Sequence, residues 1–144
     1  MKKIATLFIC LLIGGCMTLP KSASELKNSS SSTREFCHHQ SPSDTFTFLS
    51  EKMKSCYTRQ GSAYFPESLN PFLELEKFND DKFQMAVGMN NPGIPKTYTM
   101  DVDLTLGSDD CETHVKVYAL NSMWLSHADK VGEWLQGDND DCAW

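Results

Sequence analysis

Thr97-Tyr98-Thr99-Met100-Asp101-Val102-Asp103-Leu104-Thr105-Leu106 is the stretch that decides the fold of this chain. Apolar residues occupy every second position of the stretch, and threonine or aspartate fills the positions between them. A period of two predicts a β-strand with one dry and one wet face. Such a strand is typical of an antiparallel sheet that is covered on one side only.

The next fourteen residues predict a hairpin partner for this strand. Gly107-Ser108-Asp109-Asp110 has turn composition, and residues 111–120 then resume a strand pattern. Folding the two strands about Ser108 and Asp109 places apolar residues opposite one another and acids opposite bases. The pairs expected from this fold are Val102–Val115 and Met100–Val117 on the dry face, with Asp101–Lys116 and Asp103–His114 on the wet face.

A second hairpin is expected upstream of the first. Residues 72–78 and 82–89 have strand composition and flank the turn sequence Asn79-Asp80-Asp81. Residues 90–95 then turn the chain into the long strand. These segments predict four strands in meander order.

Two amphipathic helices are expected to cover the dry face. The first begins at an N-cap of Ser43 or Asp44 and runs to about Cys56, and the second begins at Asn121 or Ser122 and ends at Gly137. Their apolar stripes are Phe46, Leu49, Met53 and Cys56 in the first, and Trp124, Ala128, Val131 and Leu135 in the second. The predicted fold is α+β: a four-stranded antiparallel meander sheet with an N-terminal and a C-terminal helix packed on one face (α-β-β-β-β-α).

The first 16 residues have the pattern of an export signal. Lys2 and Lys3 precede the apolar residues 4–13, and two glycines and a cysteine follow. Ile13-Gly14-Gly15-Cys16 resembles the lipobox of bacterial lipoproteins. The resemblance implies cleavage before Cys16, acylation of Cys16 and attachment to a membrane through the acyl chains. Met17 stands where many lipoproteins retained in the inner membrane have Asp, which implies an outer-membrane lipoprotein. We expect the protein to face the periplasm, although the sequence leaves a surface-facing orientation open.

Residues 17–35 are expected to form a flexible tether, because they are poor in apolar residues and contain a run of four serines. About 20 such residues have a root-mean-square reach of roughly 25 Å. The expected organisation is therefore a signal peptide over residues 1–15, a lipidated cysteine and tether over residues 16–35, and a single α+β domain over residues 36–144.

Cleavage would leave four cysteines in the domain, since Cys10 departs with the signal and Cys16 carries lipid. The four are Cys37, Cys56, Cys111 and Cys142. In an exported protein, four cysteines predict two disulfides. Because the last helix should return antiparallel to the last strand, we expect Cys111–Cys142 and hence Cys37–Cys56, and Cys56–Cys111 remains open. No pair has the spacing of a structural zinc site, so no metal is expected.

No motif in the sequence points to catalysis or to a cofactor. There is no Gly-x-Ser-x-Gly elbow and no phosphate-binding glycine loop. The pair His38-His39 lies at the edge of the predicted tether, and His127 falls on the polar side of its predicted helix. His114 opposite Asp103 is interpreted as a cross-strand charge pair on a solvated face.

The wet face of the long hairpin is the surface on which a partner is expected. Its candidate residues are Thr99, Asp101, Asp103, His114, Lys116 and Tyr118, with Trp144 as an additional aromatic anchor. The sequence pI is about 5.1, and removal of residues 1–15, which hold two lysines and no acid, changes the formal net charge from −6 to −8. An acidic chain is not expected to bind nucleic acid.

The predicted element order is similar to that of several small α+β lipoproteins of the bacterial envelope, including components of outer-membrane assembly machinery. This resemblance implies a non-enzymatic domain that binds a protein or serves as a scaffold. One alternative is an inhibitor or immunity protein against an envelope-active hydrolase or toxin, since an acidic domain suits a basic target. A second alternative is an enzyme of unknown type.

Overall fold

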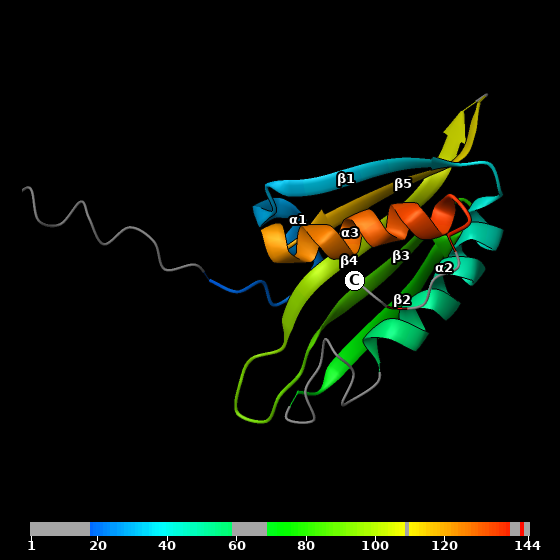
Figure 1. The fold of residues 1–144 in the computed structure, drawn as a ribbon. Helices are drawn as coiled ribbons and strands as arrows, with labels where there is room; N and C mark the ends of the chain where they lie inside the picture. The colour runs from blue at the N-terminus through cyan, green and yellow to red at the C-terminus, as the bar shows by residue number, and fades with distance from the viewer. Residues whose placement is uncertain (1–17, 59–68, 109, 139–141, 143–144) are drawn as a thin grey trace, which may run out of the picture.

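A computed structural model of the chain describes residues 18–58, 69–108, 110–138 and 142. Five strands form one antiparallel sheet in the spatial order β1-β5-β4-β3-β2 (Figure 1). The elements are α1 (Ala23–Ser29), β1 (Ser32–His38), α2 (Pro42–Tyr57), β2 (Pro71–Asn79), β3 (Lys82–Met89), β4 (Thr97–Ser108), β5 (Cys111–Ala119) and α3 (Ser122–Leu135). The α+β class and the antiparallel sheet are confirmed, but the predicted number of four strands is wrong.

The fifth strand, β1, pairs with β5 at the edge of the predicted meander. Its sequence, Ser-Thr-Arg-Glu-Phe-Cys-His, has one large apolar residue, Phe36, so it lacks the apolar alternation that reveals a strand. Phe36 packs on the core, and Gly132 of α3 lets the ring approach closely, since a Cβ there would lie 2.3 Å from it. Arg34 adds an ion pair with Asp129 of α3 at 2.5 Å.

The long hairpin has the predicted faces but not the predicted partners. Val102 pairs with Val117 and Met100 with Ala119, because the strands close with Ser108 opposite Cys111. Each predicted pair is therefore wrong by two residues. A shift of two leaves every side chain on the same face, since side chains alternate with a period of two.

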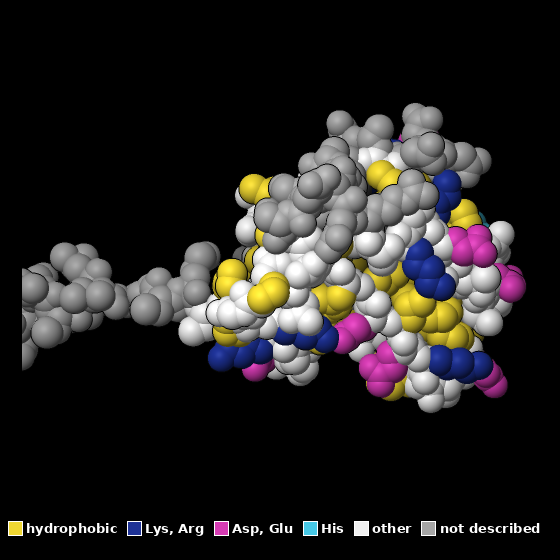
Figure 2. All heavy atoms as spheres, turned by 90° about the horizontal axis from the view of Figure 1, so that it is seen from below, with side chains coloured by type: hydrophobic (Ala, Val, Ile, Leu, Met, Phe, Trp, Pro, Cys, Tyr) yellow, Lys and Arg dark blue, Asp and Glu magenta, His cyan; other side chains and the backbone are white. Residues whose placement is uncertain are grey.

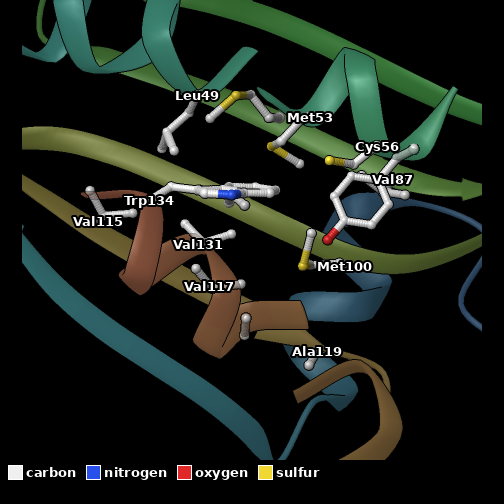
Figure 3. Close-up of a cluster of buried hydrophobic side chains, with 14 of the residues drawn as sticks. Leu49, Met53, Cys56, Val87, Met100, Val115, Val117, Ala119, Val131 and Trp134 are labelled. Carbon is white, nitrogen blue, oxygen red and sulfur yellow. The ribbon is translucent and has the colours of Figure 1, made fainter. Parts of the chain in front are cut away.

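Helices α2 and α3 cover one face of the sheet, as predicted (Figure 1). Ser41 caps α2 and Asn121 caps α3, each through a side-chain oxygen that accepts backbone N–H groups. Figure 3 shows Trp134 of α3 lying among side chains of α2 and of the sheet, including Leu49 and Val115. This core fixes the orientation of both faces of the sheet.

Helix α1 packs on the opposite face, across β4 and β5. Its Leu26 is fully buried against Ala86 and Tyr98, and the Tyr98 N–H donates to the carbonyl oxygen of Pro20 at 3.0 Å. The prediction of a flexible tether as far as residue 35 is therefore wrong, because residues 20–35 belong to the domain. The predicted signal peptide and Cys16 lie outside the described residues.

A β-bulge in β4 directs Tyr98 towards α1. The register passes from Val87 opposite Met100 to Gly88 opposite Tyr98, so Thr99 is the extra residue. Strict alternation places Tyr98 on the same face as Met100, whereas the bulge reverses the strand's faces before Thr99. Tyr98 consequently joins Leu26 in a second, smaller apolar cluster.

The two disulfides are Cys37–Cys111 and Cys56–Cys142, with Cα atoms 5.4 and 5.3 Å apart. The prediction of two disulfides is confirmed, whereas the predicted pairs Cys111–Cys142 and Cys37–Cys56 are both wrong, as is Cys56–Cys111. The reason is β1, which places Cys37 opposite His114 and so beside the start of β5. The end of α3 does lie near that point, where Gly137 lines a hollow with His38.

Candidate functional site

The predicted partner surface has a buried and an accessible part. Thr99 and Asp101 are fully buried. Asp103, His114, Lys116 and Tyr118 remain half-buried. Trp144 lies outside the described residues. Fewer residues of the wet face are therefore accessible to a partner than the sequence predicts.

Under α1, one ammonium group lies between two carboxylates. Lys27 Nζ donates to both oxygens of Asp103 at 2.6 and 2.7 Å and lies 3.2 Å from Asp101 Oδ2. Gln84 Nε2 donates to Asp101 Oδ1 at 2.6 Å, whereas Asp101 Oδ2 accepts no hydrogen bond. The ion contact at 3.2 Å and the missing hydrogen bond are compatible, because an ion pair requires proximity and a hydrogen bond also requires alignment.

This arrangement changes how both groups titrate. Burial raises the pKa of Asp101 to about 7, and the negative charge of Asp103 adds to the rise while Lys27 opposes it. Burial alone would lower the pKa of Lys27, but its hydrogen bond to Asp103 and the charges of both carboxylates raise it. Lys27 therefore stays charged, and Asp101 is the group of this cluster that titrates near neutral pH.

The substitution Asp101→Asn is expected to remove one contribution that lowers stability as pH rises. The native pKa of Asp101 is raised from 3.8 to about 7, so the native state binds more protons than the unfolded state between these values. The free energy of unfolding therefore falls as pH rises from about 4 to about 7, by at most about 1.4 kcal/mol per pH unit. His127 acts in the opposite direction below its ordinary pKa, so the informative quantity is the difference between wild type and variant.

Urea unfolding of both proteins between pH 4 and pH 8 measures this difference. Relative to wild type, Asp101→Asn should become more stable as pH rises. Asn28→Asp, an exposed change on α1, serves as the control for a charge near the cluster. A difference between wild type and Asp101→Asn that stays constant across the range would contradict the raised pKa.

The accessible part of the hairpin forms what we call the outer strip: Glu35, Asp103, His114, Lys116 and Tyr118. Lys116 Nζ pairs with Glu35 at 2.7 Å, and His114 Nε2 lies 3.7 Å from the same carboxylate. The hydrogen bond from Lys116 lowers the pKa of Glu35. The predicted pair of Asp103 with His114 is wrong, because His114 lies opposite Thr105 and Asp103 lies opposite Lys116.

Tyr118 is the aromatic member of the outer strip. Two cations lie near its ring, with Lys27 Nζ 5.8 Å and Lys116 Nζ 5.5 Å from the ring centroid. Cations at this distance over a ring are attracted by its negative face. The strip therefore places an aromatic ring next to charged side chains. These residues lie on β5 and its neighbours, and β5 is hydrogen-bonded to β1 on one side and to β4 on the other.

His127 lies in the core, which contradicts its predicted place on the polar side of the helix. It is 8% exposed, its Nδ1 lies 3.1 Å from the Tyr57 hydroxyl, and its ring stacks on Trp124 with centroids 4.5 Å apart. Burial lowers its pKa to about 4. A neutral imidazole at physiological pH fits a structural role in the contact between α2 and α3.

A second accessible feature lies at the end of the sheet where the described chain begins. Two hollows of about 510 and 420 Å³ adjoin there and share the lining residues Leu19, Ile94, Pro95 and Thr97. We call the two together the end groove. Leu19 and Ile94 are 53% and 56% exposed, and Trp124 lines the inner hollow.

The sequence predicts neither Lys27 nor Leu19 as functional residues, because both fall in the predicted tether. One signal was readable: Ser22-Ala23-Ser24-Glu25 has the spacing of a capping box. Ser22 Oγ accepts the N–H of Glu25 at 3.1 Å, and the Glu25 side chain returns to the Lys21 N–H at 2.7 Å. This pattern marks the start of α1.

No protein-family model, curated protein or solved structure matches this chain. Within the described residues, no helix is both long and apolar enough to span a bilayer. The same residues contain no group of three or more His, Cys, Asp or Glu side chains placed to hold a metal ion. The outer strip and the end groove are the two accessible surfaces described above on which a partner could bind.

Proposed function

We propose that this chain is a lipid-anchored protein of the bacterial envelope, attached through acyl chains on Cys16 to the outer membrane and facing the periplasm. The lipobox-like Ile13-Gly14-Gly15-Cys16 supports the anchor. The two disulfides support export, because disulfides form and persist in oxidising compartments. Two or more acyl chains would make the attachment stable, since a single chain binds a membrane only marginally.

The folded domain is proposed to be a non-enzymatic protein-binding or scaffold domain whose contact surface is the outer strip. The observation that carries this proposal is the placement of Tyr118 beside Lys116 and Glu35 on a rigid, accessible sheet face. Tyrosine supplies much of the binding energy in many protein interfaces, and charged side chains around it give specificity.

An inhibitor or immunity protein is the second candidate, and the charge of the domain favours it. The chain would carry a formal net charge of −8 after cleavage of residues 1–15. An acidic surface attracts a basic hydrolase or toxin and speeds their encounter. Identification of the captured partner separates this candidate from a scaffold.

The charge reversal Lys116→Glu is expected to weaken capture of the partner at least about tenfold, because like charges brought together at an interface cost several kcal/mol. The measurement is affinity capture from detergent-solubilised envelopes, with quantitative mass spectrometry of the bound proteins. Lys54→Glu is the matched control, since it makes the same charge change at an exposed position of α2, on the opposite face.

Two outcomes would contradict the proposal for the domain. Either no protein is enriched with the native chain, or Lys116→Glu and Lys54→Glu capture the same proteins equally well. The anchor is tested separately with Cys16→Ala, which should leave the membrane fraction. Retention of that variant in membranes would count against acylation at Cys16.

A further inference from the structure

We infer that the end groove rests on the surface of the lipid bilayer, so that the domain stands on the membrane and does not hang at a distance from it. The inference depends on the proposed acylation of Cys16 and adds a second contact with the same membrane. The groove is defined by Leu19, Ile94, Pro95 and Thr97 together with the other residues that line its two hollows. The occupant is a lipid surface, and the contact is apolar.

The length of chain between the anchor and the domain is the first argument. Pro20 is buried and its carbonyl oxygen accepts the N–H of Tyr98, so the chain is fixed to the sheet from this residue on. Four residue steps separate Cys16 from Pro20, and four extended steps span at most about 14 Å. The groove-lining Thr18 is only two steps from Cys16, or about 7 Å.

This short reach replaces the predicted tether of about 20 residues with its reach of roughly 25 Å. Helix α1 and strand β1 take up the residues that the tether would have used. Acyl chains on Cys16 would therefore bring the end groove to the bilayer surface. At this distance the groove meets lipid at a high effective concentration, so a weak contact suffices to hold the domain against the membrane.

The chemistry of this end is the second argument. Leu19 and Ile94 line the same hollows from separate segments, and each is more than half exposed. Solvent-exposed apolar residues that lie together commonly mark an interaction site. In Figure 2, the broad hydrophobic area on the right of the view is bordered by Lys or Arg and by Asp or Glu side chains.

The charged residues of the groove indicate that the contact does not require anionic lipid. Lys21 and Glu25 both line the outer hollow, so the two charges balance there. Lys96, next to Pro95, is paired with Glu74 of β2. A neutral lipid surface therefore suits the groove, in agreement with the acidic character of the whole chain.

This placement also orients the outer strip. Strand β4 begins at Thr97 beside the groove and reaches Leu106 nine residues later, about 30 Å away at the usual rise of a strand. With the groove on the lipid, the strands rise from the membrane. The outer strip then lies on an upright face and stays open to the periplasm.

Quenching by brominated lipid tests the inference. The acylated full-length protein is placed in phosphatidylcholine vesicles whose acyl chains carry bromine, which quenches tryptophan emission only at short range. Ile94→Trp adds a reporter in the groove, and Leu106→Trp adds a matched reporter at the far end of β4, at a position that is 57% exposed. The emission of the protein without either substitution is subtracted as background.

We expect the Ile94→Trp reporter to lose emission in brominated vesicles and the Leu106→Trp reporter to keep it. Equal quenching of the two reporters, or no quenching of either, would overturn the inference. A protein that covers the groove would give the second result, because it would keep lipid away from residue 94. Mass spectrometry of the same samples reports acylation of Cys16. Absence of acyl chains would overturn both the anchor and the docking, whereas acylated protein that floats with vesicles without quenching at residue 94 would overturn the docking alone.

Discussion

Replacing Cys37 and Cys111 together by alanine is expected to lower the free energy of unfolding by about 4 kcal/mol, with loss of the chain-entropy restraint as the main cause. The disulfide joins residues 74 positions apart in the sequence, so it closes a long loop in the unfolded chain. Since domains of this size are stable by about 5–15 kcal/mol, one disulfide is a large part of the total. Urea unfolding of the oxidised wild type and of the double variant measures the change.

The second disulfide provides a comparison within the same chain. Cys56 and Cys142 are 86 positions apart, so their removal should cost a similar amount through the unfolded state. Cys56 is also almost fully buried in the core, and its loss adds a packing term that Cys37, which is exposed, does not have. A change below about 1 kcal/mol in the Cys37/Cys111 variant would contradict the entropic account.

Peptide mapping without reduction tests the pairing itself. Peptides that contain Cys37 should be joined to peptides that contain Cys111, and Cys56 peptides to Cys142 peptides. Recovery of Cys37 joined to Cys56 would mean that β1 does not pair with β5 as described. The mapping requires protein from an oxidising compartment, where disulfides persist.

The substitution Leu26→Asp is expected to detach α1 from the sheet while the rest of the domain stays folded. Leu26 is fully buried beside Ala86 and Tyr98, so a carboxylate at this site would be desolvated among apolar side chains. Loss of a buried leucine alone costs about 2–5 kcal/mol, and an unpaired buried charge adds to this. Release of α1 avoids that cost, because the core under α2 and α3 does not depend on Leu26.

Native-state hydrogen exchange measures the detachment. The amides of Leu26, Ser30 and Tyr98, which donate to backbone carbonyls at the α1 contact, should exchange about a hundredfold faster, as expected for a local loss of about 3 kcal/mol. The pKa of Asp101 should also fall towards its ordinary value, since burial under α1 is the main cause of its rise.

Asn28→Asp is the control for this experiment. It adds the same charge to the same helix at an exposed position, so it should leave exchange at Tyr98 unchanged. Two results would contradict the role of Leu26. One is equal acceleration by both variants, and the other is a Leu26→Asp protein that unfolds globally in a single transition with α1.

Much of the sheet and both large helices could be predicted from short-range patterns. The alternation in residues 97–106, the Asp-rich turn after β2 and the helical stripes each report the environment of their own segment. Trp124, Ala128 and Val131 are all buried in the main core. Because one core covers this whole side of α3, the apolar residues recur at helical spacing and predict the helix. Where one apolar face meets one core, the sequence pattern and the packing agree.

The outer surface was predicted less well, because its structure depends on segments far apart in the chain. Asp101 reads as a solvated residue from its place in the alternation, yet Lys27 and Gln84 bury it from 74 and 17 positions away. The side of the sheet on which Tyr98 lies is predicted wrongly, because nothing local in the sequence marks the bulge at Thr99. Alternation identifies a face, but it does not report what covers that face.

By itself, then, the sequence determined the α+β class, the meander β2-β3-β4-β5, the faces of the long hairpin and the presence of two disulfides. Tertiary structure alone decided the fifth strand, the strand register, the disulfide pairing and the place of residues 20–35 in the domain. The physical reason is that α1 and β1 carry only Leu26 and Phe36 as large buried or partly buried apolar residues. Such short segments fold because the rest of the sheet provides their hydrogen bonds and apolar contacts. These contacts come from residues distant in the sequence, so no local pattern predicts them.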